Sequence, residues 1–347
     1  MKTLLFLVIF TVCACATNRD VDRTPSAEKA PRYRCAKFIS MLFSNPYKKT
    51  YSLQKFKYKN AIKAFHRDLD ARAKNLKIGS IPFIRLQTSK KYAPTVVLLH
   101  GYSDSPASMR EISKMYYERG YHVIAPLYND HGLKTDLQKD ALDNSSLDRW
   151  REDVDFAVSV AQAVAGKKKV HVAGYSMGAT LAMDLSWRHP GLIASRTLFA
   201  PLFKEEKFVI QIGLYLLNLF TDGSIYKEID ETSVFYKRMT YKQTIEMHRL
   251  TRQVQPHLLK KKDNIPTAVF RVDPKNETTV DDSFIDAFVK EYGVSDQHYI
   301  YHNPQAEQDP VLHRDFTSAR VNSSGRANPA LDLIFDGLNM FLDSLKN

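Results

Sequence analysis

Cysteine is scarce in this chain of 347 residues, which argues against a fold held together by disulfides. The sequence has three cysteines, and two of them, Cys13 and Cys15, lie in the apolar stretch at its start. If that stretch is removed as a leader, only Cys35 remains and no internal disulfide can form. Internal repeats and low-complexity segments are also missing. A hydrophobic content of 44% is enough for a large core.

The first residues lack the length of a membrane-spanning segment. Lys2 is followed by an apolar run from Leu4 to Val12 and then by small residues, which is typical of a secretory leader over residues 1–16. Residues 12–15 (Val-Cys-Ala-Cys) also resemble a bacterial lipobox, in which Cys15 is lipidated after cleavage. Cleavage after Ala16 by an ordinary signal peptidase is the alternative. We expect an exported protein and favour a membrane-anchored lipoprotein over a secreted one.

Acidic residues are few near the N-terminus. Residues 31–77 contain thirteen Lys and Arg against Asp68 and Asp70, while the net charge of the whole chain is +12. We interpret residues 17–77 as a basic tether and a helical segment. One apolar stripe with helical spacing is expected to pack on the main domain: Tyr58, Ile62, Phe65 and Leu69. A solvated helix face explains the charge better than a contact with anionic lipid headgroups.

Signatures of nucleic-acid binding are absent as well. The chain has no aromatic-basic RNA motif, no zinc-ligand spacing and no phosphate-binding glycine loop. Because the chain is also expected to be exported, we exclude a nucleic-acid partner.

From residue 78 onward, short apolar runs alternate with helical patterns. This alternation predicts an α/β domain over residues 78–347, with a mainly parallel sheet covered by helices on both faces. The expected strands lie at 95–99, 122–126, 170–173, 197–200, 267–272 and 298–301, and the expected helices near 107–118, 147–165, 179–185, 241–254 and from about 282 and 329. The alternation stops between about 202 and 265, where the apolar run Phe208–Phe220 occurs.

The sequence has only 13 glycines, and two of them frame a serine in Gly-Tyr-Ser-Met-Gly at residues 174–178. This G-x-S-x-G pattern directly follows an apolar strand and precedes a helix. Such a turn holds the serine hydroxyl clear of the sheet, and glycines give the backbone room to turn sharply. The start of the helix at Ser176 favours negative charge developing there. Ser176 is therefore the candidate nucleophile.

The motifs together resemble those of α/β-hydrolases, in particular bacterial carboxylesterases and monoacylglycerol lipases. Residues 98–106 resemble the His-Gly loop after an early strand of these enzymes. Residues 126–132 and 150–154 are similar to the stretch after the next strand and to the helix before the serine turn. The resemblance implies that residues 202–265 form a helical cap over an acyl pocket. Ala179 departs from the family, because many relatives have a second glycine there.

A serine hydroxyl needs a base that accepts its proton. The order of the family, serine then acid then histidine, leaves His302 and His313 as candidates. His313 is preferred, because it lies on the loop between the last strand and the last helix, where relatives have their base. His100 is expected to shape the oxyanion loop rather than to titrate.

The acid that orients the base should follow the strand at 267–272. Glu277, Asp273 and Asp281 compete for this role. Residues 277–280 (Glu-Thr-Thr-Val) resemble the Asp-x-x-Val pattern of the family with Glu in place of Asp, so Glu277 is preferred and Asp273 is the chief rival.

Two backbone N–H groups should bind the oxyanion, and the resemblance assigns them to Met177 and Tyr102. The chemistry implied is hydrolysis of carboxylic esters through an acyl-enzyme, with neither metal nor organic cofactor. The expected partners are a small ester or lipid substrate and, through the anchor and the basic segment, a membrane surface. A peptidase, thioesterase or acyltransferase on the same fold is the alternative, as is a catalytically silent surface binding protein.

Overall fold

The computed structural model describes residues 53–134, 145–204, 224–226, 238–260, 263–277, 279–302, 310–321 and 324–346. The leader, Cys35 and the run Phe208–Phe220 lie outside the described residues. No helix among those described is both long and apolar enough to cross a bilayer.

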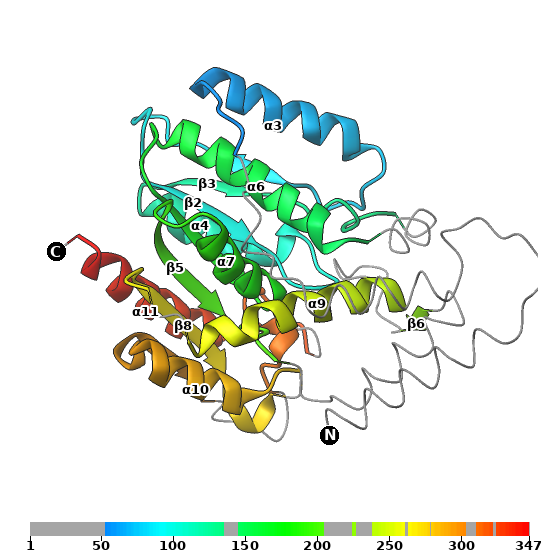
Figure 1. Ribbon diagram of the computed structural model, residues 1–347, viewed down its shortest axis with the longest axis vertical. Helices are drawn as coiled ribbons and strands as arrows, with labels where there is room; N and C mark the ends of the chain where they lie inside the picture. Colours follow the sequence, from blue (N-terminus) through cyan, green and yellow to red (C-terminus); the bar gives the residue numbers. More distant parts are fainter. Residues whose placement is uncertain are drawn as a thin grey trace, which may run out of the picture.

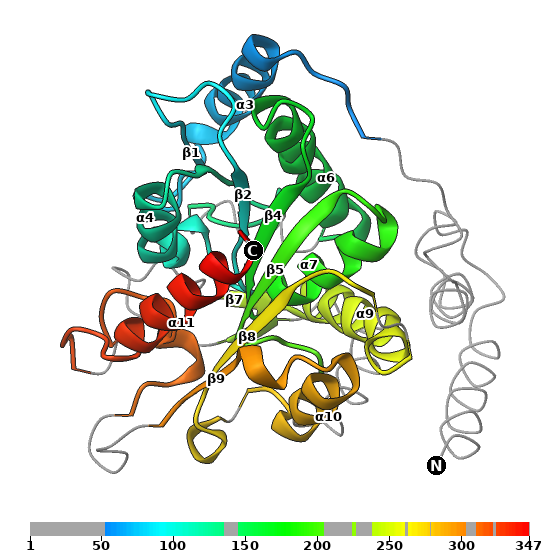
Figure 2. The same ribbon diagram turned by 90° about the vertical axis from the view of Figure 1, so that its left-hand side faces the viewer.

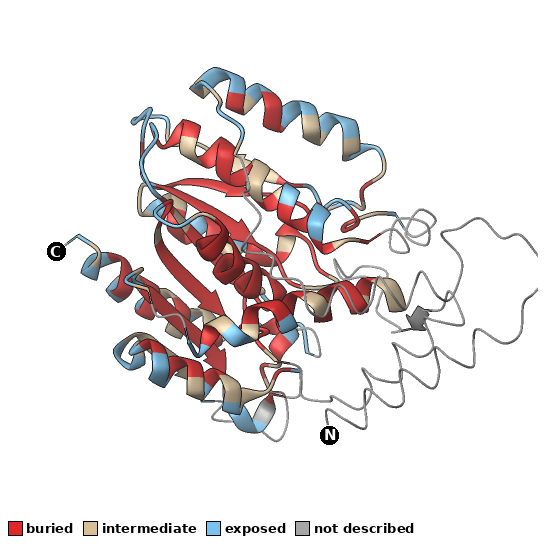
Figure 3. Cartoon of the chain, in the orientation of Figure 1, coloured by how far each residue is buried: buried red, intermediate tan, exposed pale blue. Residues whose placement is uncertain are grey.

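A seven-stranded sheet forms the centre of the fold (Figure 1). Its strands lie in the order β1-β3-β2-β4-β5-β8-β9, and all neighbours are parallel except β1, which runs antiparallel to β3. The strands are β1 (Phe83–Arg85), β2 (Thr95–Leu99), β3 (His122–Ala125), β4 (Val170–Tyr175), β5 (Ile193–Phe199), β8 (Thr267–Val272) and β9 (His298–Tyr301). Every residue of β2, β3 and β8 is buried, as expected where helices cover both faces of a parallel sheet (Figure 3).

The helices divide between the two faces of the sheet. One apolar core lies between the sheet and α6, α7 and α9, and a second lies between the sheet and α4 and α11 on the opposite face (Figure 2). The helices are α3 (Tyr58–Ala73), α4 (Arg110–Glu118), α6 (Leu147–Val164), α7 (Met177–Arg188), α9 (Tyr241–Leu258), α10 (Asp282–Tyr292) and α11 (Ala330–Ser344), with short 3-10 turns η3 (Pro106–Met109), η5 (Pro274–Asn276), η6 (Ser295–Gln297) and η7 (His313–Asp315). Every residue of α7 is buried.

The predicted α/β class and the mainly parallel sheet are confirmed, and most predicted elements agree within a few residues. Two strands of the seven-stranded sheet differ from the prediction. β5 begins at Ile193 rather than at the predicted Thr197. The prediction began too late because Arg196, a charged residue, lies buried within the strand, where it forms an ion pair with Asp263 and donates to Thr267 at 2.9 Å. A buried charge interrupts the apolar pattern from which strands are read. The three residues of β1 are too few to show a strand pattern in the sequence, and β1 pairs with β3 at the edge of the sheet.

Helix α3 packs against α6 on the outside of the domain (Figure 1). Its buried residues are Ala61, Ala64 and Phe65, and Tyr58 and Ile62 pack partly against the same core. Three residues of the expected stripe, Tyr58, Ile62 and Phe65, therefore face the main domain, whereas Leu69 is half-buried and lies outside this core. The lysines of the helix stay exposed. Of the expected cap, the structure describes its first residues, a two-stranded hairpin of β6 (Ser224–Tyr226) and β7 (Arg238–Thr240), and α9.

Candidate active site

The serine turn connects β4 to α7 at the carboxyl edge of the sheet. Ser176 has φ 53° and ψ −117°, outside the regions that residues with a Cβ usually adopt. The flanking glycines are required by space. A Cβ at Gly174 would lie 2.3 Å from the carbonyl oxygen of Gly178, and one at Gly178 would lie 2.1 Å from that of Leu99. Because Gly174 and Gly178 have no side chain, β4, the turn and β2 can approach one another closely enough to present the serine.

His313 meets this serine from the loop between β9 and α11. Its Nε2 lies 2.8 Å from Ser176 Oγ. A hydrogen bond also holds the backbone of His313, because the buried hydroxyl of Tyr175 donates to its carbonyl oxygen at 2.6 Å. The residue before the serine thus fixes the loop that carries the histidine.

Glu277 completes a hydrogen-bonded chain of three side chains. Its Oε2 lies 2.8 Å from His313 Nδ1, and its Oε1 accepts from the backbone N–H groups of Thr279 at 2.7 Å and Val280 at 3.2 Å. Burial alone would raise the pKa of Glu277, but His313 and these backbone donors hold its pKa below the ordinary value. The carboxylate is therefore ionised and anchored on both oxygens.

The rival residues lie elsewhere and have other partners. Asp273 accepts from the N–H of Lys275 at 3.0 Å and lies 3.0 Å from Nδ1 of His302, an exposed side chain at the end of β9. Asp281 caps α10 by accepting from the N–H of Phe284 at 3.3 Å and forms an ion pair with Lys204. The structure brings neither aspartate to His313.

The two expected oxyanion donors, Met177 and Tyr102, lie on segments next to Ser176. Met177 is the first residue of α7, so its N–H has no acceptor one turn earlier within the helix. Tyr102 follows Gly101, and an added Cβ on that glycine would lie 3.4 Å from Ser176 Cβ. The His-Gly loop therefore passes directly beside the serine.

Buried polar groups hold this His-Gly loop in shape. His100 Nδ1 donates to the carbonyl oxygen of Gly101 at 3.0 Å, and its Nε2 accepts from the N–H of Tyr128 at 3.4 Å. Burial and the nearby His131 lower the pKa of His100 well below its usual value, so it remains neutral. Asp104 accepts from the N–H of Ser105 at 2.6 Å, and burial raises the pKa of its carboxyl to about 7.

The sequence also matches the model of a known protein family. The model of the Hydrolase_4 family, described as "Serine aminopeptidase, S33", matches residues 90–303, more than half of the chain. The chain belongs to this family. The matched span includes Ser176 and Glu277 and ends before His313.

Two curated proteins are similar to part of this chain. A thermostable monoacylglycerol lipase of Bacillus sp. strain H-257 is 25% identical over 170 residues, which cover 47% of this chain and 64% of that enzyme. A probable lysophospholipase of Arabidopsis thaliana, BODYGUARD 2, is 26% identical over 149 residues, 39% of this chain and 29% of the plant protein. The chain spans less than two thirds of each relative.

Solved structures show the same α/β-hydrolase fold. A structure from work on two metagenome-derived lipolytic enzymes, LipS and LipT, has a TM-score of 0.60 at 15% identity, over 78% of this chain and 99% of the other. A soluble variant of monoglyceride lipase from Saccharomyces cerevisiae has a TM-score of 0.54 at 13% identity, over 76% of this chain and 91% of the other.

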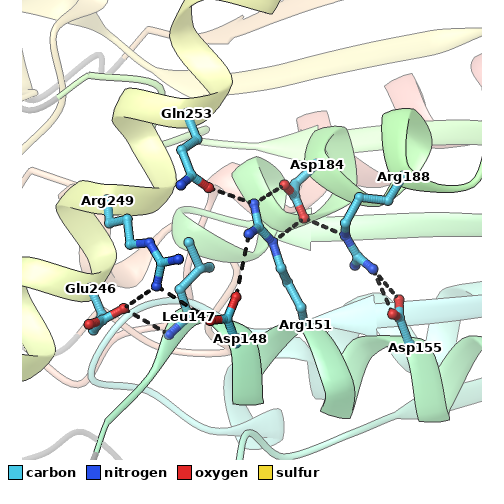
Figure 4. Close-up of polar contacts among 9 residues, drawn as sticks. All are labelled: Leu147, Asp148, Arg151, Asp155, Asp184, Arg188, Glu246, Arg249 and Gln253. Atoms are coloured by element: carbon cyan, nitrogen blue, oxygen red, sulfur yellow. Dashed lines mark hydrogen bonds and ion pairs between the residues drawn. The ribbon is translucent and has the colours of Figure 1, made fainter. Parts of the chain in front are cut away.

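Buried charges fix α7, the helix that begins after Ser176, to its neighbours (Figure 4). Asp184 of α7 is fully buried and accepts from Arg151 of α6, at 3.0 Å to Nε, and from Arg188 Nε at 2.8 Å. Arg188 also binds both oxygens of Asp155 at 2.6 Å. Burial alone would raise the pKa of Asp184, but the two arginines lower it to about 2. The pairing compensates for the loss of hydration of these charges.

The same network reaches α9. Arg151 donates to Oε1 of Gln253 at 2.9 Å (Figure 4). Nearer the site, Glu246 of α9 accepts from the N–H of Leu147 at 3.1 Å, at the start of α6. At the start of α9, Thr244 Oγ1 lies 2.9 Å from the hydroxyl of Tyr102. Helix α9 therefore contacts α6 and the His-Gly loop at once, and touches the buried charges that secure α7.

Sequence reasoning did not find several supporting residues. Tyr175, Thr244 and Asp184 act through contacts with residues distant in the chain, and Asp104 acts through the backbone of its neighbour Ser105. None of these side chains is specified by the motifs. The signal for Asp184 would have been a charge in the middle of an apolar helix. Among the described residues, no group of three His, Cys, Asp or Glu side chains is arranged to hold a metal ion.

Proposed function

We propose that this chain is a serine hydrolase that cleaves carboxylic esters, of the carboxylesterase and monoacylglycerol lipase type, through an acyl-enzyme intermediate. The observation that supports it best is the continuous chain from Ser176 Oγ through His313 to Glu277, with both hydrogen bonds at 2.8 Å. This is the geometry that nucleophile, base and orienting acid require.

In the proposed reaction, Ser176 Oγ attacks the ester carbonyl carbon while His313 Nε2 accepts the hydroxyl proton. Glu277 holds the proton on Nδ1 and stabilises the imidazolium. The imidazolium then gives its proton to the leaving alcohol as the ester bond breaks, leaving an acyl group on Ser176. Water then attacks this acyl-enzyme while His313 accepts its proton. The imidazolium returns that proton to Ser176 Oγ as the bond to the acyl group breaks and the acid product leaves.

The oxyanion formed at each attack would be bound by the N–H groups of Met177 and Tyr102. Each donor of this kind contributes about 3 kcal/mol to transition-state stabilisation. The positive end of α7 acts in the same direction, because Ser176 directly precedes its first turn.

The names of the relatives support a lipid ester as the substrate, a monoacylglycerol or a similar single-chain ester. The apolar run Phe208–Phe220 in the expected cap, which lies outside the described residues, would contact the acyl chain. Each CH₂ buried there strengthens binding by about 0.8 kcal/mol. We therefore expect medium-chain esters to be cleaved with a higher kcat/KM than acetyl esters.

The test is labelling by a serine-directed fluorophosphonate, followed by hydrolysis of p-nitrophenyl esters of increasing chain length. Wild type should be labelled, and Ser176→Ala should not be labelled and should lose at least about a thousandfold in kcat/KM. Full labelling of Ser176→Ala would refute the assignment. An amino-acid p-nitroanilide serves as the peptidase substrate, and its preference over every ester would favour that alternative. A rate that is highest on acetyl esters would contradict a lipid-sized pocket.

A further inference from the structure

An isoleucine projects fully into solvent at the turn between α3 and β1. Ile78 is completely exposed, and Ile81 is 42% exposed. The turn between them is well defined, because Ser80 N–H donates to the carbonyl oxygen of Lys77 at 3.1 Å and Arg110 donates to that of Gly79 at 3.3 Å. An isoleucine that is fully exposed on this turn gains no packing from the described residues.

This turn lies at the same edge of the sheet as Ser176. Strand β1 runs antiparallel to β3, and its first residue, Phe83, pairs with the last residue of β3, Ala125. The turn therefore lies beside the carboxyl ends of the parallel strands, where β4 also ends. The loop after β3 joins the two places. Gly132 accepts from the N–H of Lys77 at 2.8 Å, and Tyr128 donates to the carbonyl oxygen of His100 at 3.0 Å.

Positive charge surrounds the exposed isoleucines. The segments that meet at the turn, residues 74–81, 110–114 and 127–134, carry five cations: Lys74, Lys77, Arg110, Lys114 and Lys134. Their carboxylates are Glu111 and Asp130, and Asp130 is buried against His131, Ser145 and Trp150. Lys134 is exposed, and its N–H donates to the carbonyl oxygen of Asn75 at 2.9 Å, which fixes its backbone beside the turn.

We propose that this surface, the Ile78–Ile81 turn with its surrounding cations, docks on an anionic lipid bilayer. The projecting isoleucine enters the boundary between headgroups and acyl chains, and the lysines and arginine contact the phosphates. A single apolar tip with cations on the segments beside it suits the depth of a bilayer interface. It offers little flat apolar area to a folded protein partner.

Docking in this orientation turns the carboxyl edge of the sheet toward the membrane. A lipid ester leaving the bilayer would then have a short path to Ser176. This consequence rests on the proposed function, whereas the binding of the surface to lipid does not.

The test is co-sedimentation of the full chain with vesicles of phosphatidylcholine, with and without phosphatidylglycerol. Ser176→Ala is the background, so that no lipid is hydrolysed during the measurement. Ile78→Ser should weaken partitioning onto anionic vesicles about tenfold, because the isoleucine side chain is no longer buried. Lys134→Glu should weaken it about tenfold as well, and only when phosphatidylglycerol is present. The first 52 residues are the same in all variants, so their contribution cancels.

Two control variants make the same kinds of substitution at exposed residues outside the proposed surface. Met340→Ser removes a side chain that is 65% exposed on α11, and Lys168→Glu reverses an exposed charge before β4, at the opposite edge of the sheet. Both should leave partitioning unchanged. In the active background, all four variants should keep wild-type rates on a soluble ester, which shows that they fold.

A dye that responds to polarity, attached at Ile78→Cys in a chain whose Cys13, Cys15 and Cys35 are replaced by serine, should shift its emission to the blue on anionic vesicles. The proposal is overturned if this shift is absent, or if Ile78→Ser partitions like its background. It is also overturned if Lys134→Glu alone weakens binding, because a purely ionic surface would suit an acidic protein instead. A chain that binds vesicles but cleaves no ester refutes only the proposed function.

Discussion

His313 and His302 are two histidines at the same edge of the sheet with different surroundings. His313 is nearly buried and meets Ser176, whereas the side chain of His302 is 71% exposed and meets Asp273. We expect His313→Ala to lose at least about a thousandfold in kcat on a p-nitrophenyl ester, since no other base lies within hydrogen-bonding distance of the hydroxyl among the described residues. His302→Ala is the matched control and should keep most of the activity. The reverse ranking would show that the base is His302.

Two carboxylates near β8 allow a similar comparison. Glu277→Gln keeps the size of the side chain but offers an amide to His313 Nδ1, so the imidazole loses its orientation and its charge partner. We expect kcat to fall by orders of magnitude, while Asp273→Asn should stay within a few fold of wild type. Steady-state kinetics of both variants decide the question. Equal small losses would remove Glu277 from the proposed mechanism.

At this scale, the sequence led to the three side chains that the structure joins. The order of the elements explains why these side chains meet, because a serine after β4, an acid after β8 and a histidine after β9 all reach one edge of a parallel sheet. The supporting residues could not be predicted. Tyr175 is the variable position of its motif, and its contact with the carbonyl oxygen of His313 depends on how a loop 138 residues later returns to the sheet.

The helices α6, α7 and α9 are joined by charges whose protonation affects stability. Asp184 has a pKa of about 2 in the folded chain, below the 3.8 of an ordinary aspartate. Its contribution, on the order of 2 kcal/mol, is therefore complete above about pH 4 and is lost as the pH falls toward 2. Chemical denaturation between pH 5 and pH 2 should show this loss.

Asp184→Asn should lower the unfolding free energy by about 3–5 kcal/mol at neutral pH, because it leaves two buried arginines without their shared partner. Asp148→Asn is the control. Asp148 also contacts Arg151, at 3.8 Å, but its side chain is 53% exposed, so its removal should change stability by less than about 0.5 kcal/mol. If both variants were equally stable, the buried network would not hold the helices together.

A single hydrogen bond connects the His-Gly loop to α9. Tyr102→Phe removes the hydroxyl that lies 2.9 Å from Thr244, and Thr244→Val removes its partner while keeping the shape. We expect each change to lower kcat a few fold with little change in KM, because the N–H of Tyr102 is less firmly placed. The double variant should be no worse than either single one, and additive losses would indicate that the two hydroxyls act separately.

Element by element, the sequence was most informative where apolar runs were unbroken. The predicted bounds of the strands at 267–272 and 298–301 coincide with β8 and β9. It was least informative where burial involves charge. Arg196 in β5 and Asp184 in α7 look like surface residues, and only the packing of neighbouring elements shows that they are paired inside.

For the whole molecule, the position in the cell remains a prediction. If Cys15 is lipidated, wild type should fractionate with the membrane. Cys15→Ser should then move the chain to the soluble exported fraction, provided that cleavage after Ala16 still occurs. Fractionation and N-terminal sequencing of both forms are the measurements. A wild type that is already soluble and begins at Thr17 would replace the lipoprotein with a secreted protein.

The backbone at Ser176 limits how the chain can evolve. A residue with a side chain held at a φ of 53° costs on the order of 1–3 kcal/mol, and glycine would avoid most of that cost. Ser176→Gly thus removes the hydroxyl and at the same time relieves the backbone strain, so it stabilises the fold. Under the proposed function, turnover is what requires serine there. In a duplicated copy of the gene released from that selection, inactivation and greater resistance to heat would arise in the same step.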